Sequence, residues 1–201
     1  MKARITASEF NAALKRVSRA VDNKNVCTWM SGILLEADEN NGTMVATAAN
    51  GSQTVRESIT CNVLCEGKIL LDGKLLTDIV SKLPTGECEI DAMDGKKAVV
   101  KAKGYKTNLS LLKADDFIGK VECEGKTDTI SMAAAELVNA IKTVLYAAAI
   151  QDTRATLVGV NIESKGGGDA LFCGLNGFQL AVCRARVNGS GSAMNIIVPR
   201  K

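Results

Sequence analysis

The sequence contains no histidine, and only 3% of its 201 residues are aromatic. The absence of histidine excludes a Ser-His-Asp triad, a Cys-His dyad and every zinc site that uses imidazole. The scarcity of aromatic residues argues against a large aromatic-lined ligand cavity. The formal net charge is +3, from 25 basic and 22 acidic residues, which is too small to indicate a nucleic-acid-binding protein by itself.

Cysteine is present seven times, an odd number, and no Cys-x-x-Cys pair occurs. The two closest cysteines, Cys61 and Cys65, would lie about 13 Å apart on one face of a strand, which is too far for a disulfide. We therefore expect reduced, buried thiols in a cytoplasmic protein, with no metal and no cofactor. No segment approaches the roughly 18 apolar residues of a membrane-spanning helix, so we expect neither membrane insertion nor export.

The chain carries an internal repeat. Four short motifs recur in the same order at an offset of 126 or 127 residues, and the Asn-Gly-x-Gln motif at 50–53, which returns at 176–179, is the clearest. The last residue, 201, then corresponds to residue 74 (201 − 127 = 74). The repeat predicts a whole domain over residues 1–124 and an incomplete second domain over residues 127–201.

Each copy combines helices with short strands. Thr6 and Glu9 form a capping-box pattern that opens a helix over residues 8–21, whose apolar residues follow at spacings of four, three and four. A second helix is predicted over residues 74–83, and Pro84 ends it. Together with strands bounded by polar and glycine-containing breaks, the helices predict an α+β fold built of repeated β-α-β-β-β units. The first copy has strands at 3–5, 32–37, 43–49, 53–61, 68–71, 88–92, 97–103 and 106–112. The second has a strand at 129–131, a helix at 132–149 and strands at 158–163, 169–174 and 178–186. One more strand, at 196–198, matches 69–71 and begins a further unit that is otherwise missing.

Motifs along the whole chain resemble the bacterial DNA sliding clamp family, the beta subunit of the replicative DNA polymerase III. The motifs lie at residues 10–21, 31–36, 78–84, 151–154 and 198–201, and their order and spacing carry the likeness. Members of that family have three such domains, and two chains close head to tail into a ring around duplex DNA. The resemblance implies a DNA-clamp fold with the helices on the inner face and antiparallel sheets outside.

The resemblance also implies a function without enzymatic activity. A clamp is a processivity factor that encircles double-stranded DNA and tethers the replicative polymerase. The polymerase and the clamp loader bind it through short peptide motifs, and the family assembles as a homodimeric ring. This chain has one whole domain and part of the next, so the expected tether is incomplete.

Basic residues on the first predicted helix fit a DNA-facing surface. Lys15, Arg16 and Arg19 stand there against Glu9, a balance that an ordinary solvated helix face would also show. A weakly basic inner wall can neutralise phosphates without contacting bases, as sliding requires. The resemblance adds two loop contacts and a basic pair at the end of the chain. The implied DNA-binding residues are Lys15, Arg16, Arg19, Lys24, Lys82, Gln151, Arg200 and Lys201.

The resemblance places half of a partner-peptide pocket on the second domain. The family's threonine, histidine and arginine in this pocket are replaced here, so we expect a more apolar floor without a cationic group. An ordinary turn and strand is the alternative interpretation for Phe178 and Gln179. The other half of the pocket would lie on a third domain. The implied pocket residues are Leu157, Leu175, Gly177, Phe178, Gln179 and Leu180.

The family's subunit interface uses an edge strand and a helix of domain one. By resemblance it would include Lys74, Lys106, Thr107 and Leu109. The second domain has only its first helix, so one side of that helix should lack a covering partner. We expect residues 127–201 to be poorly stable alone or to be covered by another chain, because each exposed large apolar side chain forgoes about 1.5–3 kcal/mol. The residues that we expect to be left facing nothing are Leu137, Ile141, Val144 and Leu145.

Two other functions remain open at this stage. One is a stand-alone or truncated peptide-binding adaptor derived from a clamp, which would use the predicted pocket. The other is a small hydrolase, which would require a carboxylate pair to converge in a cleft, because no histidine can serve as a base. The glycines at 166–168 are a weak phosphate-loop candidate, since no Gly-Lys-Ser/Thr follows them.

Overall fold

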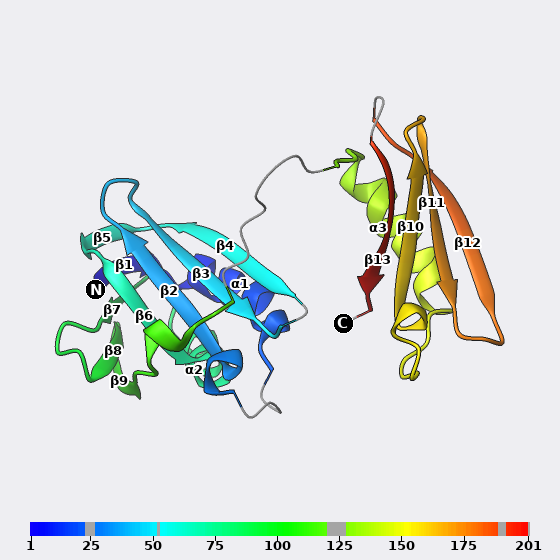
Figure 1. Ribbon diagram of the computed structural model, residues 1–201. Helices are drawn as coiled ribbons and strands as arrows, with labels where there is room; N and C mark the ends of the chain where they lie inside the picture. The colour runs from blue at the N-terminus through cyan, green and yellow to red at the C-terminus, as the bar shows by residue number, and fades with distance from the viewer. Residues whose placement is uncertain (23–26, 52, 120–127, 189–191, 201) are drawn as a thin grey trace. The chain divides into compact units, whose positions relative to one another are not determined.

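The computed structural model describes residues 1–22, 27–51, 53–119, 128–188 and 192–200. The chain forms two compact units, Met1–Glu122 and Cys123–Lys201, and each has its own hydrophobic core (Figure 1). Within the described residues, none of the helices has the length and apolar composition needed to span a bilayer.

The first unit holds two antiparallel sheets that contribute to one core. Their strand orders are β5-β1-β7-β8-β9 and β4-β3-β2-β6. The chain passes from one sheet to the other at Cys61, the single residue between β4 and β5. The strands of the first sheet are β5 (Asn62–Cys65), β1 (Lys2–Thr6), β7 (Glu87–Asp91), β8 (Lys97–Ala102) and β9 (Tyr105–Ser110), and those of the second are β4 (Thr54–Thr60), β3 (Thr43–Ala49), β2 (Gly32–Asp38) and β6 (Gly67–Asp72).

Two helices pack against each other in the first unit. The predicted apolar stripe of the first helix is confirmed, because Phe10, Leu14 and Val17 are completely buried. The Asp72 carboxylate caps the second helix by accepting a hydrogen bond from the Leu75 amide at 2.7 Å. The helical segments are α1 (Ala7–Val17), its 3-10 continuation η1 (Ser18–Ala20), η2 (Thr28–Ser31), α2 (Gly73–Ser81) and η3 (Ala114–Asp116).

The second unit is one helix on one sheet of order β12-β11-β10-β13. The helix covers one face of the sheet, where its buried residues Ala140 and Val144 share a core with Phe172 (Figure 1). Gly174 permits this approach, because a Cβ there would clash with the Val144 carbonyl oxygen. The elements are α3 (Ala134–Leu145), η4 (Ala155–Leu157), β10 (Gly159–Lys165), β11 (Asp169–Leu175), β12 (Leu180–Arg186) and β13 (Ala193–Pro199).

The second unit repeats the arrangement of one sheet and one helix of the first unit, which confirms the predicted α+β fold of repeated units. The order β12-β11-β10-β13 matches β4-β3-β2-β6 strand for strand, and α3 occupies the position of α1. The asparagine of the repeated Asn-Gly motif also accepts the same hydrogen bond in both units. The side chain of Asn50 accepts from the Gln53 amide at 3.0 Å, and that of Asn176 accepts from the Gln179 amide at 2.8 Å.

Several predicted elements of the first unit differ in the structure. The capping box is wrong, because the Thr6 side chain makes no capping hydrogen bond and α1 begins at Ala7. The helix predicted to residue 21 is α-helical only to Val17. The strand predicted at 53–61 ends at Thr60, and the separate strand β5 was not predicted. The first unit therefore has one strand, β5, in addition to those of the two predicted β-α-β-β-β units.

The second unit differs from its prediction mainly at its ends. No strand forms at residues 129–131, although the carbonyls of Thr129 and Ser131 accept hydrogen bonds from the amides of Ser192 and Asn188. The helix predicted at 132–149 is shorter, and β12 begins at Leu180 because the turn occupies the two preceding residues.

One face of the second unit is only partly covered. Val144 is fully buried, so the expectation that its side faces nothing is wrong, whereas the other three predicted helix residues are partly buried. On β13, Ile196 and Val198 are exposed. In the first unit, α2 packs beside α1 and against β2 and β6, whereas the described part of the second unit has only one α-helix.

Candidate functional site

The basic residues of the first helical segment lie on its solvent side. Because the apolar stripe of α1 faces the core, Lys15, Arg16 and Arg19 are all exposed. Lys15 lies in the last turn of α1, and Arg19 follows four residues later in η1. Within the described residues, neither forms an ion pair. Lys82, the C-cap residue of α2, is also exposed.

Arg16 is different from its neighbours because a carboxylate already holds it. Its Nη2 donates to Glu57 Oε1 of β4 at 2.6 Å. This hydrogen bond holds the pKa of Glu57 below its ordinary value and raises the pKa of Arg16. The sequence placed Arg16 among free cations, and it could not indicate a partner 41 residues away.

The remaining predicted DNA contacts fall in three groups. Gln151 is exposed between α3 and η4. Arg200 is half-buried, and its Nη1 donates to the carbonyls of Leu145 and Ala148 at 2.8 and 2.6 Å, so it closes the C-terminal end of α3. Lys24 and Lys201 lie outside the described residues.

The predicted peptide pocket centres on the turn between β11 and β12. Leu175 and Leu180 are directly opposed across the two strands and are both exposed. The Asn176 side chain accepts from the Phe178 amide at 3.0 Å and so fixes the turn, in which Gly177 has a φ of +90°. Phe178 is 98% exposed. The turn therefore presents apolar side chains to solvent on a rigid backbone.

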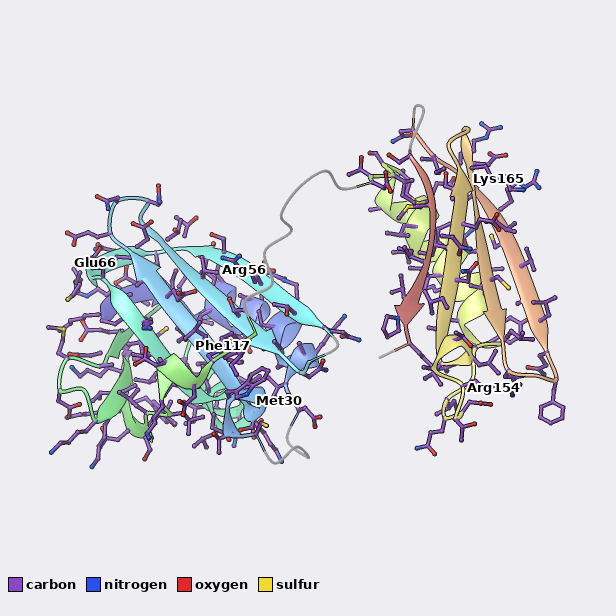
Figure 2. The ribbon with its side chains drawn as sticks, viewed as in Figure 1. Met30, Arg56, Glu66, Phe117, Arg154 and Lys165 are labelled. Atoms are coloured by element: carbon purple, nitrogen blue, oxygen red, sulfur yellow. The ribbon has the colours of Figure 1, made fainter. Side chains whose placement is uncertain are left out.

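A cation lies beside this turn, although the sequence predicted none. A Cβ on Gly177 would lie 3.7 Å from Arg154 Nη2. Asp152 holds the guanidinium with two hydrogen bonds, from Nε at 3.0 Å and from Nη2 at 3.1 Å. The Arg154 side chain lowers the pKa of Asp152 to about 2 through these bonds. Figure 2 shows Arg154 at the end of the sheet where β11 turns into β12.

Arg154 therefore places a cation beside the turn, where the sequence predicted a pocket without one. Arg154 comes from the segment before η4 and not from the 175–180 run on which the prediction was based. The motif at 151–154 contained the signal, since an Asp two residues before an Arg allows a local bidentate pair. Leu157 ends η4 and is half-buried, and its carbonyl accepts from the Ala149 amide at 2.9 Å.

The predicted interface residues divide between surface and core. Strand β9 is at the edge of its sheet, and Lys106 on it is exposed, as is Lys74 at the start of α2. Thr107 is half-buried. Leu109 is only 3% exposed and belongs to the core of its own unit, so its side chain is not available to a partner. The alternation of β9 explains this, because Thr107 and Leu109 point to the same, inner side.

Three acidic residues that could serve a hydrolase already have partners in the structure. Asp91 forms an ion pair with Lys2 at 3.2 Å, and Asp94 accepts from the amides of Lys96 and Lys97 at 3.0 Å. Asp115 forms an ion pair with Lys68 at 2.6 Å. Among the residues that the structure describes, no cluster of three or more Cys, Asp or Glu side chains is placed to bind a metal.

Comparisons with known proteins agree with this geometry. The family model of the DNA polymerase III beta subunit, N-terminal domain, matches residues 1–119, and that of the central domain matches residues 131–201. The beta sliding clamp of Synechocystis sp. is 33% identical over 192 residues, which cover 92% of this chain and 48% of that protein.

Solved structures give the same result. The chain is similar over its whole length to Caulobacter crescentus pol III beta, with a TM-score of 0.90, 25% identity and 55% of that chain covered. The DNA polymerase III subunit beta of Pseudomonas aeruginosa gives a TM-score of 0.87 at 25% identity, with 54% of that chain covered. The chain thus spans about half the length of these relatives. It has the sliding-clamp fold and belongs to the DNA polymerase III beta subunit family.

Proposed function

We propose that the chain acts as part of a DNA sliding clamp, a non-enzymatic processivity factor for the replicative polymerase. The observation that carries the proposal is the exposed row of cations on α1 and η1, next to α2, in a unit that matches the clamp family. Lys15, Arg19 and Lys82 can each neutralise a phosphate without reading a base. A clamp that contacts a chromosome would work in the cytoplasm of a bacterium.

The strength of this contact follows from the number of free cations. Three phosphate contacts predict a slope of about −2.7 for log K against log salt, and thus a roughly 40-fold loss of affinity between 50 and 200 mM salt. Such a contact is weak and does not fix the protein at one position along the duplex, and sliding needs both properties.

Fluorescence anisotropy of a labelled duplex, titrated with the chain at several salt concentrations, tests the proposal. The double variant Lys15→Ala/Arg19→Ala should reduce the slope to about −0.9. The matched control Lys96→Ala/Lys103→Ala removes the same charge from exposed positions on either side of β8, outside α1, η1 and α2, and should leave the slope unchanged. Equal effects of the two double variants would contradict a helix-borne DNA contact.

The turn between β11 and β12 supports the second part of the proposal, the binding of short peptides from the polymerase and the clamp loader. Leu175, Leu180 and Phe178 offer an apolar surface, and Arg154 offers a preorganised cation beside it. The matching ligand is an extended peptide with apolar side chains and one carboxylate. The same site would serve the alternative function, a peptide-binding adaptor that does not act on DNA.

Fluorescence polarisation with a labelled peptide containing two leucines and one aspartate tests this site. Leu180→Asp should weaken binding at least about tenfold, because it places a charge on the surface against which an apolar side chain of the peptide would be buried. Leu64→Asp, at an exposed leucine of β5 in the other unit, is the control and should bind as the wild type does. Peptide binding without salt-dependent duplex binding would favour the adaptor.

In the whole protein, we propose a homodimeric ring in which the edge of β9 takes part in the subunit contact. Lys106 and Lys74 are exposed there, and β9 has one unpaired edge within the described residues. An exposed strand edge can bind a strand of another chain through its main-chain groups. Leu109 would act only by supporting β9 from the core.

A further inference from the structure

The ion pair between Arg16 and Glu57 joins the face of α1 that carries the DNA-binding candidates to the edge strand β4. We propose that Glu57 is a positioning residue that withholds Arg16 from the DNA and so limits how tightly the clamp holds the duplex. The inference rests on the proposed function and deepens it. The proposal gives Glu57 a role on this face, although a carboxylate repels phosphate and does not itself bind DNA.

The position of Glu57 is unusual for a charged residue. Val55, Glu57 and Ile59 alternate along β4 and point to the same side, and Ile59 is buried in the core while Val55 packs against it. Glu57 thus turns toward α1 rather than away from it. Small residues of α1, Ala12 and Ala13, line the hollow between α1 and β4 in which the pair lies, and they leave room for both side chains.

The internal repeat shows that the fold does not need this pair. In the second unit, Thr143 stands at the position of Arg16 and Cys183 at the position of Glu57. The helix α3 packs on β12 there without any ion pair in the described residues. A structural role common to the repeat therefore does not explain the pair, whereas a role on the cationic face of the first unit does.

The pair weakens the DNA contact without abolishing it. The 2.6 Å bond from Nη2 to Glu57 partly neutralises the Arg16 charge and orients its guanidinium, so a phosphate must compete with the Glu57 carboxylate for Arg16. Both side chains are partly exposed, 54% for Arg16 and 28% for Glu57, so the pair changes an equilibrium by only about 1.4- to 5-fold. Arg16 can therefore bind a DNA phosphate less readily than an unpaired arginine would. The number of unpaired cations that contact DNA from this face stays small.

The test compares two variants that remove the same charge. Glu57→Gln releases Arg16, whereas Glu9→Gln removes an exposed carboxylate from α1 that lines the same hollow and forms no ion pair in the described residues. In the duplex anisotropy titration, Glu57→Gln should bind about 1.4- to 5-fold more tightly than Glu9→Gln. It should also make the slope of log K against log salt more negative by about 0.9, one additional phosphate contact.

Two controls keep the outcome unambiguous. Adding Arg16→Gln to Glu57→Gln should cancel the gain, and Glu57→Ser should reproduce the gain with a different side chain. The proposed function stands if the wild type binds the duplex with the expected slope of log K against log salt. The role of Glu57 is then refuted if Glu57→Gln and Glu9→Gln bind alike, or if the gain in affinity persists when Arg16 is also replaced. If no variant binds DNA, the proposed function fails, and this inference fails with it.

Discussion

Substitution by alanine at two phenylalanines of the second unit, six residues apart, should have very different effects on the stability of that unit. Phe172 on β11 is fully buried in the core beneath α3, whereas Phe178 in the following turn is 98% exposed. Phe172→Ala removes a core side chain and leaves a cavity. Phe178→Ala removes a side chain that the fold does not bury.

The expected magnitudes follow from this difference in burial. Phe172→Ala should destabilise the second unit by about 3–5 kcal/mol, the usual range for a buried phenylalanine. For a unit of this size each kcal/mol shifts Tm by about 4–8 °C, so the loss should be at least about 12 °C. Phe178→Ala should stay within about 0.5 kcal/mol, because the Asn176 bond to the backbone of residue 178 is retained.

Hydrogen exchange of α3 and β11 amides is the suitable assay, because the single tryptophan, Trp29, lies in the other unit. Phe172→Ala should lower protection throughout α3 and β11, and Phe178→Ala should leave it unchanged while weakening peptide binding. A loss of protection in Phe178→Ala comparable to that in Phe172→Ala would refute the assignment of Phe178 to a binding surface.

Three further predictions concern single groups. Arg200→Met should destabilise the second unit by about 1.5 kcal/mol, with lost protection at the C-terminal end of α3, because two carbonyl partners are lost. Burial raises the pKa of Cys88 from 9.0 to about 11, so its thiolate fraction at pH 8 is about 100-fold below that of an ordinary thiol. Mass spectrometry should therefore show far slower alkylation of Cys88 than of the exposed Cys27. Burial raises the pKa of Glu89, but hydrogen bonds from three cations outweigh burial and leave it below its ordinary value. The contribution of Glu89 to the stability of the first unit is therefore present at neutral pH and lost as pH falls through the lowered pKa. In urea unfolding between pH 2 and 6, the free energy of unfolding should depend less on pH in Glu89→Gln than in the exposed control Glu87→Gln.

The repeat and most elements could be predicted because they depend on local patterns. The Asn-Gly turns at residues 50 and 176 use a side chain to bind their own backbone, and such turns form without help from distant segments. The stripe of α1 follows from the helical period alone. The capping box failed because the motif indicates only that Thr6 could cap the helix, while the extended β1 runs directly into α1.

The missed strand β5 depends on tertiary pairing. Nothing in residues 53–65 marks where one sheet ends and the other begins, because β4 pairs with β3 while β5 pairs with β1, a segment about sixty residues away. The missing strand at 129–131 has a similar cause. That segment receives two hydrogen bonds from residues 188 and 192 but lacks a regular ladder.

The surroundings of the candidate site residues could not be predicted from the sequence. The sequence located the turn at 175–180, yet Arg154 reaches it from a segment more than twenty residues earlier. It located Arg16 on a helix face, yet the carboxylate that neutralises it comes from β4. Leu109 was the avoidable error, because the alternation along β9 already placed it on the inner side.

The central claim, that the helices of the first unit form the DNA-facing surface, can be tested by amide NMR of the chain with a short duplex. Chemical-shift changes should concentrate at Lys15, Arg19 and Lys82 and at their neighbours in α1, η1 and α2. They should fade as salt is raised. Changes confined to β8 and β9, with α1 and α2 unaffected, would contradict the account.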